Sequence, residues 1–230
     1  MKGRVLILGG ALACLVLVSA HAQTTNLFEL AKGGTPQAMK AAIAKGVDVN
    51  LRESAQGKTL LIWAAQFNSN PDVIDVILKA GGDVKARDTG PTYVKGAPAY
   101  GWTALMWAAA SSKSAEVIAT LVKGGSDVKA KDKDGLTPLM IAAANNENDS
   151  VVARVASVSS DVNAKDNNGF TALMYAASKN HNPAVIIALL KAGAKAKAKN
   201  NKGYTALDYA KANRALNETD AIMQLQKASE

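Results

Sequence analysis

The chain has 230 residues, a formal net charge of +8 and one cysteine, Cys14. A single cysteine excludes an intramolecular disulfide framework, so the stability of the fold must come from packing. The basic residues are spread along the chain, which favours solubility and acidic partners and supports nucleic acid only weakly as a partner.

The N-terminus has the pattern of a cleaved secretory signal. Lys2 and Arg4 precede an apolar run over 5–18, and small residues end the segment at Ala22. The 14 apolar residues of this run are fewer than the roughly 20 needed to span a bilayer. We therefore expect residues 1–22 to be removed and the protein to be periplasmic or secreted. A lipoprotein modified at Cys14 is the minor alternative.

A phrase of the form Gly-x-Thr-x-Leu recurs five times after this segment. Its threonines are separated by 44, 34, 34 and 34 residues. Self-similarity at such a period indicates stacked supersecondary units, which usually form binding surfaces. The five copies begin at Gly57, Gly101, Gly135, Gly169 and Gly203.

Signals within each unit predict two helices joined by a short turn. The threonine of the phrase is a good N-cap for the first helix. The second helix has its own N-cap residue, often followed by proline at the first helical position. Glycine then ends this second helix, and an Asp/Asn-rich turn leads to the next phrase. The caps of the second helices are Thr35, Asn70, Ser114, Asn148 and Asn182.

The segment from Asp161 to Leu173, Asp-Val-Asn-Ala-Lys-Asp-Asn-Asn-Gly-Phe-Thr-Ala-Leu, resembles the ankyrin repeat. The resemblance covers nearly all of 24–230 and implies an all-α repeat solenoid of about six helix-turn-helix units joined by β-hairpin loops. One departure concerns the histidine that usually follows Thr-Pro-Leu. Methionine stands there, at Met106, Met140 and Met174, so the histidine's hydrogen bonds to the hairpin are expected to be missing.

The repeat boundaries give one domain over 23–230. We expect an N-terminal cap at 24–56, four repeats, and a more polar C-terminal cap at 203–230. The unit at 135–168 lacks the glycine that ends the second helix and has Ser159 there. Because serine there occupies the glycine turn, we predict that Ser159→Gly stabilises the protein by roughly 0.5–1 kcal/mol. The four repeats are 57–100, 101–134, 135–168 and 169–202.

The variable residue of the Gly-x-Thr phrase is the first candidate contact site. The resemblance places it where the hairpin meets the concave face, so large side chains there form a stripe able to anchor a partner. The alternative is that each one covers the hairpin stem of its neighbour. The candidate anchors are Trp102, Leu136, Phe170 and Tyr204, with Lys58 at the same position of the first copy.

Three further groups of residues complete the candidate surface. A second row, four residues after each threonine, is expected to be core: Trp63, Trp107, Ile141, Tyr175 and Tyr209. An insertion of ten residues within 88–101 carries Tyr93 and Tyr100, either as contact residues or as a tolerated surface loop. Lys133 and Asn167 lie at expected hairpin tips, where basic side chains either steer an acidic partner or form a solvated edge.

Catalytic chemistry finds little support in the sequence. His181 is the one histidine after residue 22, and no His/Cys cluster has metal-ligand spacing. No phosphate-binding glycine loop or activated nucleophile is recognisable. We expect no enzyme, no cofactor and no metal. We expect instead a monomeric module that binds a periplasmic enzyme and either stabilises or inhibits it, and an acidic face on that enzyme would suit the basic chain. The alternatives are a structural protein that binds anionic envelope polymers and a secreted effector that binds host proteins.

Overall fold

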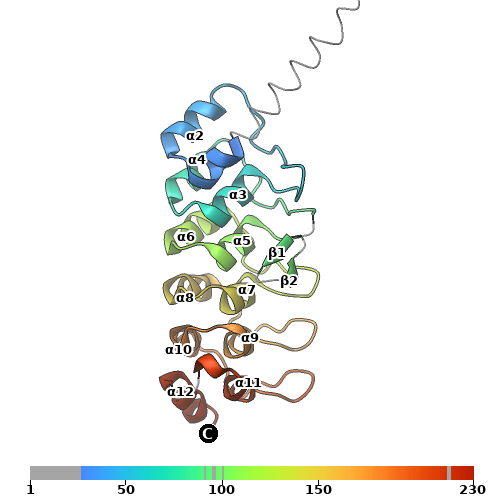
Figure 1. Cartoon of the computed structure of the whole chain (residues 1–230), viewed down its shortest axis with the longest axis vertical. Helices are drawn as coiled ribbons and strands as arrows, with labels where there is room; N and C mark the ends of the chain where they lie inside the picture. The colour runs from blue at the N-terminus through green and yellow to red at the C-terminus, as the bar shows by residue number, and fades with distance from the viewer. Residues whose placement is uncertain (1–26, 91, 95–96, 100, 217–218) are drawn as a thin grey trace, which may run out of the picture.

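The computed structural model describes residues 27–90, 92–94, 97–99, 101–216 and 219–230. Residues 27–33 are helical, and the following helices come in pairs separated by extended loops (Figure 1). The elements are α2 (Pro36–Ile43), α3 (Leu60–Phe67), α4 (Pro71–Lys79), β1 (Thr92–Val94), β2 (Ala97–Ala99), α5 (Ala104–Ser111), α6 (Ala115–Lys123), α7 (Pro138–Asn145), α8 (Asp149–Val158), α9 (Ala172–Lys179), α10 (Pro183–Lys191), α11 (Ala206–Ala212), the 3-10 helix η1 (Arg214–Leu216) and α12 (Asp220–Ala228).

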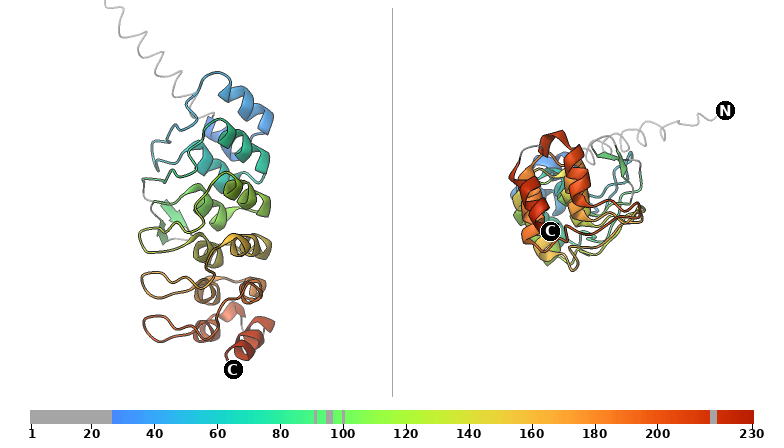
Figure 2. Two further views of the ribbon diagram at one scale, coloured as in Figure 1. Left: turned by 180° about the vertical axis from the view of Figure 1, so that it is seen from behind. Right: turned by 90° about the horizontal axis from the view of Figure 1, so that it is seen from below.

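The helices form two parallel rows. Helices α3, α5, α7, α9 and α11 contact one another in sequence and make the inner row, while α2, α4, α6, α8, α10 and α12 make the outer row. The extended loops project from the inner row on one side of the molecule (Figure 2). The predicted all-α solenoid of paired helices is therefore confirmed. Two of the extended loops have a single antiparallel β-bridge between their two arms in the described residues, Arg52 with Thr59 and Arg87 with Thr103.

The insertion supplies the strand pair. Strands β1 and β2 are antiparallel and place Tyr93 opposite Pro98. Both lie on the loop side of the inner row, beside α5 and α7 (Figure 1). The ten extra residues thus add an appendage to one unit without interrupting the two helix rows.

The helix caps follow the sequence signals closely. The Thr59 hydroxyl accepts a hydrogen bond from the Ile62 amide, and the threonines that begin α5, α7, α9 and α11 do the same in their own first turns. Asparagine caps begin α4, α8 and α10. Ser114 departs from the expectation because its side chain makes no capping hydrogen bond.

The end of α8 contradicts one expectation from the sequence. After α4 the chain turns at Gly81 with φ of 90°, a conformation that side chains resist. At the equivalent point after α8, Ser159 has φ of −70° and ψ of 135°, which is ordinary extended backbone. Its hydroxyl donates to the Val155 carbonyl at 2.7 Å. Since no left-handed turn is required, the expected gain from Ser159→Gly is wrong.

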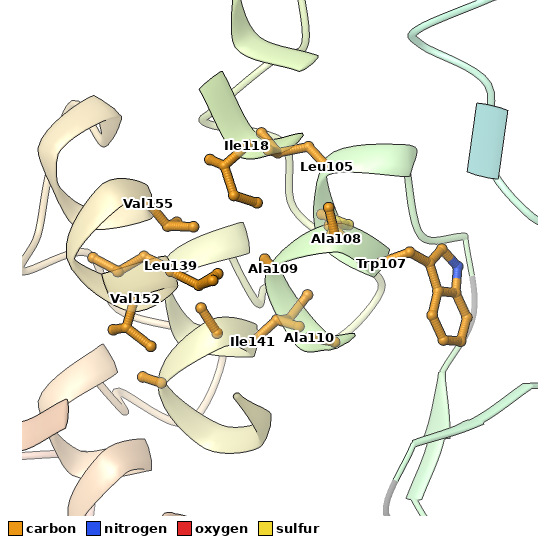
Figure 3. Close-up of a cluster of buried hydrophobic side chains, with 14 of the residues drawn as sticks. Leu105, Trp107, Ala108, Ala109, Ala110, Ile118, Leu139, Ile141, Val152 and Val155 are labelled. Carbon is orange, nitrogen blue, oxygen red and sulfur yellow. The ribbon is translucent and has the colours of Figure 1, made fainter. Parts of the chain in front are cut away.

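The core lies between the two rows of helices. In the middle of the array, Leu105 and Ile118 of one unit meet Leu139, Val152 and Val155 of the next, all buried (Figure 3). Alanines such as Ala108 and Ala109 let neighbouring inner helices approach closely. Trp107 points away from this layer, toward the loop side (Figure 3). Among the described residues, none of the helices combines the length and apolar character needed to cross a membrane.

Candidate protein-binding face

On the loop side of the inner row, the exposure of the candidate contact residues increases from the N-terminal to the C-terminal end. The variable residue of the Gly-x-Thr phrase is buried in the first two copies, with 2% of Lys58 and 5% of Trp102 exposed. Leu136 and Phe170 are partly buried, and Tyr204 is 51% exposed. The expected stripe of four anchors is therefore accessible only toward the C-terminal end.

Trp102 is removed from the accessible face by its packing. Its ring lies 4.9 Å from that of Trp107, centroid to centroid. Its indole Nε1 donates to Asp132 Oδ2 of the next hairpin at 3.0 Å. Trp102 therefore covers the stem of the neighbouring hairpin, the alternative that the sequence left open, and it is not an exposed anchor.

An aromatic cluster occupies the C-terminal half of this face. Phe170 lies 5.3 Å from Tyr175 and 5.1 Å from Tyr209, and Tyr209 lies 6.0 Å from Tyr204. Tyr175 is buried, whereas Phe170 and Tyr209 are half-buried and Tyr204 is exposed. The cluster thus combines a buried ring, Tyr175, with an exposed one, Tyr204. Aromatic side chains that are held by their neighbours and remain partly accessible contribute strongly to interface energy.

A buried cation stands at the N-terminal end of the same row. Lys58 Nζ lies 3.6 Å from the centroid of the Trp107 ring and donates to Gln66 Oε1 at 2.8 Å. Burial lowers the pKa of Lys58 to about 8, an effect partly offset by Asp88 and Glu53. Burial likewise raises the pKa of the Asp88 carboxyl above its ordinary value, although Asp88 accepts hydrogen bonds from Trp102 and Trp107. Lys58 and Asp88 therefore find their partners within the protein, whereas the buried Trp63 Nε1 beside them has no hydrogen-bond partner among the described residues.

The hairpin tips are exposed, as the two candidate tip residues show. Lys133 and Asn167 are both at the surface. Asn167 Nδ2 donates to the Lys133 carbonyl at 3.3 Å, and Asn201 Nδ2 donates to the Asn167 carbonyl at 3.2 Å. Neighbouring tips are therefore tied to one another, which fixes their spacing along the array.

Basic side chains bridge successive loops in the same manner. Arg52 Nη1 donates to the Arg87 carbonyl at 2.7 Å, and Arg87 Nη1 donates to the Lys131 carbonyl at 3.1 Å. Lys131 Nζ continues to the Lys165 carbonyl at 3.3 Å, and Lys165 Nζ to the Lys199 carbonyl at 2.7 Å. These exposed cations form a continuous basic ladder (Arg52, Arg87, Lys131, Lys165 and Lys199). The ladder links successive loops and also places positive charge at the surface.

The insertion carries the two candidate tyrosines, Tyr93 and Tyr100. The backbone of Tyr93 belongs to β1, and its side chain lies outside the described residues. Tyr100 lies outside them altogether. Residues 1–22, which the sequence predicts to be a secretory signal, and Cys14 within them also precede the described residues.

Metal-binding groups do not assemble in the described part of the chain. It contains no group of three His, Cys, Asp or Glu side chains able to hold a metal ion. His181 is exposed, and its Nδ1 lies 3.4 Å from Glu147 Oε1. The feature that the geometry does offer is a surface of hairpin tips and half-buried aromatic rings.

Comparison with known proteins identifies the array. Residues 56–89 match a model of a single ankyrin repeat, residues 91–153 match a model described as ankyrin repeats in three copies, and residues 156–210 match one described as ankyrin repeats in many copies. The chain belongs to the ankyrin-repeat family. A search of proteins with curated functions found no match.

One solved ankyrin structure shares enough sequence to inform function. It is predatory endopeptidase Bd0816 from Bdellovibrio bacteriovorus in complex with immunity protein Bd3460. The similarity is to the ankyrin immunity protein. Sequence identity is 31%, the match covers 87% of this chain and 96% of that chain, and the TM-score is 0.64. This chain is therefore similar to an ankyrin protein that binds a protein partner, an endopeptidase.

In three units, aromatic groups of the second row make the helix-to-hairpin bonds that the family histidine would make, whereas Ile141 in the unit of Met140 has no polar group to do so. Trp107 Nε1 donates to Asp88 Oδ2 at 2.8 Å, and the Tyr175 hydroxyl donates to Asp166 Oδ2 at 2.6 Å. In the last unit, Asn200 Nδ2 donates to the Tyr209 hydroxyl at 2.7 Å. These bonds tether inner helices to hairpins, as the histidine would. Of the second row, Trp107, Ile141 and Tyr175 are buried, as expected for core, and Trp63 and Tyr209 are partly buried.

A column of buried asparagines is the main feature that the sequence analysis missed. Asn146 Nδ2 donates to the carbonyls of Ala109 and Ser112, and Asn180 Nδ2 repeats this one unit later with Ala143 and Asn146. The spacing of Asn146 and Asn180, 34 residues, was the available signal. Asn68 and Asn213 make the corresponding bonds near the two ends.

Proposed function

We propose that this protein is an exported, non-enzymatic ankyrin module that binds and inhibits an endopeptidase sharing its compartment. The observation that carries the proposal is the similarity to immunity protein Bd3460, which extends over 96% of that chain. Similarity over whole arrays preserves the number and spacing of units, and a repeat protein presents its binding surface through that spacing.

The contact surface we propose is the C-terminal half of the loop side. Phe170 and Tyr204 supply the aromatic anchors, with Leu136 beside them and the tips at Lys133 and Asn167 on the rim. Half-buried rings lose little conformational freedom on binding, since their neighbours already hold them. Binding there would inhibit by covering the peptidase, since the module itself supplies no reacting group.

The decisive experiment is inhibition of a purified peptidase. The peptidase is first isolated from the envelope or medium of the source cells by its affinity for this protein, then assayed on a peptide substrate. We expect the wild type to inhibit at stoichiometric concentration, and Phe170→Ala/Tyr204→Ala to inhibit at least about 100-fold more weakly, since hot-spot aromatics each contribute about 2 kcal/mol or more.

Met223→Ala is the matched control, because Met223 is an exposed apolar side chain on α12 away from this face. It should inhibit within about twofold of the wild type. Absence of any peptidase among the bound proteins would refute the proposed function. Full inhibition by a correctly folded double variant would refute the proposed face but leave the function standing.

A further inference from the structure

A cleft opens where two neighbouring repeats depart from the pattern together. It lies between the loop after α6 and the end of α8 and has a volume of about 430 Å³. This is within the range of about 300–1,000 Å³ typical of clefts that hold ligands. Lys129, Lys131 and Lys165 line it, together with Ser159, Ser160 and Asp161.

Two other junctions of the array are closed at the equivalent place by an asparagine, whereas the junction at Lys85 has a lysine there beside the left-handed Gly125. Asn163 Nδ2 donates to the Gly193 carbonyl at 3.1 Å, and Asn163 Oδ1 accepts from the Lys195 amide at 2.7 Å. Asn50 makes the same pair of bonds with Gly81 and Asp83. The asparagine thus braces one unit against the glycine turn of the next.

At the cleft both halves of this brace are replaced. Lys129 stands one period of 34 residues before Asn163, and Ser159 stands one period before Gly193. The extended backbone of Ser159 does not reproduce the left-handed turn of Gly193. Where an asparagine and a glycine turn close other junctions, this one has the exposed ammonium group of Lys129 and the hydroxyls of Ser159 and Ser160.

The charge of the cleft is positive after its own counter-charges are included. Three lysines and one aspartate, Asp161, line the cleft. Asp161 Oδ1 already accepts from the Asn163 amide at 2.8 Å. The C-terminus of α8 adds about half a negative charge, which attracts the lysines without neutralising them. Lys131 and Lys165 each use one N–H on a loop carbonyl, and an ammonium group has three to donate.

We propose that this cleft binds the carboxylate groups of an acidic peptide segment of the protein partner. The inference rests on the proposed function, because a protein partner is what makes a peptide the relevant ligand. Lys129 is the determinant, since its junction lacks both the bracing asparagine and the left-handed glycine turn. Lys131, Lys165 and the Ser160 hydroxyl also line the cleft and add charge and donors. A protein interface of this kind would combine aromatic anchoring with a separate charged contact.

Titration of a fluorescent hexaglutamate peptide into the purified protein tests the assignment. Hexaglutamine serves as the uncharged probe, and the ionic strength is held near 0.15 M so that long-range attraction is screened beyond about 8 Å. We expect Lys129→Asn to weaken hexaglutamate binding at least about tenfold, equivalent to about 1.4 kcal/mol, and Lys129→Glu to weaken it further.

Lys85→Asn and Lys85→Glu are matched controls. Lys85 precedes Lys129 by one 44-residue interval, is exposed, and has the same local turn, with its amide bonded to Asp83 Oδ1 at 2.9 Å against 2.8 Å for Lys129 and Asp127. Both controls should bind within about twofold of the wild type. Equal binding by wild type and Lys129→Asn, equal losses at the two positions, or equal affinity for hexaglutamine would overturn the proposal. Because no peptidase is present, failure here is distinct from failure of inhibition.

Discussion

At the scale of single residues, Asn180 shows how one amide can join two units. It is fully buried, donates to the carbonyls of Ala143 and Asn146 at 2.9 Å each, and accepts from the Asn182 amide at 2.9 Å. Loss of this side chain leaves two buried carbonyls without a partner. Each unsatisfied buried group costs about 1–3 kcal/mol.

We therefore predict that Asn180→Ala lowers the free energy of unfolding by about 2–4 kcal/mol. For an array of this size that corresponds to a fall in Tm of about 5–15 °C, measurable by circular dichroism. Asn201→Ala is the control, because Asn201 is exposed and makes a single 3.2 Å bond to the Asn167 carbonyl. A similar small loss in both variants would show that the buried column does not hold the units together.

Lys58 gives a prediction about pH. Burial lowers its pKa from 10.5 to about 8 in the folded protein, so the unfolded chain binds more protons between these values. Stability contributed by this group therefore rises with pH from about 8 to 10.5. Relative to Lys58→Met, the wild type should gain on the order of 2 kcal/mol across this window.

Urea denaturation at several pH values between 7 and 10.5 measures this difference. Other titrating groups are common to both proteins and cancel. Lys85→Met, which removes an exposed lysine, should parallel the wild type throughout. A constant difference between wild type and Lys58→Met would contradict the lowered pKa.

At the scale of elements, the boundary of α8 follows from backbone geometry rather than from alignment. The alignment places Ser159 opposite glycines of positive φ, but the helix ends there in extended backbone. Glycine would only add freedom to the unfolded chain, at about 0.5–1 kcal/mol, and would remove the hydroxyl bond to Val155.

We accordingly predict that Ser159→Gly destabilises the protein by about 1 kcal/mol, reversing the expectation from the sequence. Thermal unfolding measures it, with Ser159→Ala separating the hydroxyl from the backbone effect. A higher Tm for Ser159→Gly than for Ser159→Ala would mean that the junction adopts a left-handed turn in solution.

Features that depend on neighbouring residues could be predicted from the sequence, whereas features that depend on stacking between repeats could not. Threonine caps and glycine turns depend on neighbouring residues, so Thr59 and Gly81 could be placed from sequence alone. The burial of Trp102 depends on Asp132 in the next loop, and that of Lys58 on Trp107, contacts set by stacking. Candidate anchors could therefore be named from their period, but their accessibility could not.

At the scale of the whole molecule, the array is quasi-one-dimensional. Helices α5, α7 and α9 contact inner helices on both sides, whereas α2 and α12 have an outer-row neighbour on one side only within the described residues. Stability in such arrays is approximately a sum of unit and nearest-neighbour contributions. Local opening should therefore begin at the ends.

Hydrogen exchange detected by mass spectrometry tests this prediction. Amides of α5, α7 and α9 should exchange slowest, and those of α2 and α12 fastest, by factors that grow with the number of interfaces that must break. Uniform protection along the chain would indicate all-or-none opening, and faster exchange at α7 than at α12 would place the weak point in the middle.

The graded burial of the Gly-x-Thr row has a consequence for how a partner is positioned. An ideal repeat array has translational symmetry, so a ligand could shift by one unit and meet an equivalent surface. Here the side chain of Lys58 is buried, that of Phe170 is partly buried and that of Tyr204 is exposed, so the two ends of the row are not equivalent. A partner that contacts the exposed aromatic end therefore cannot shift along the array by one repeat without losing those contacts. The array in this way fixes both the orientation and the position of its partner.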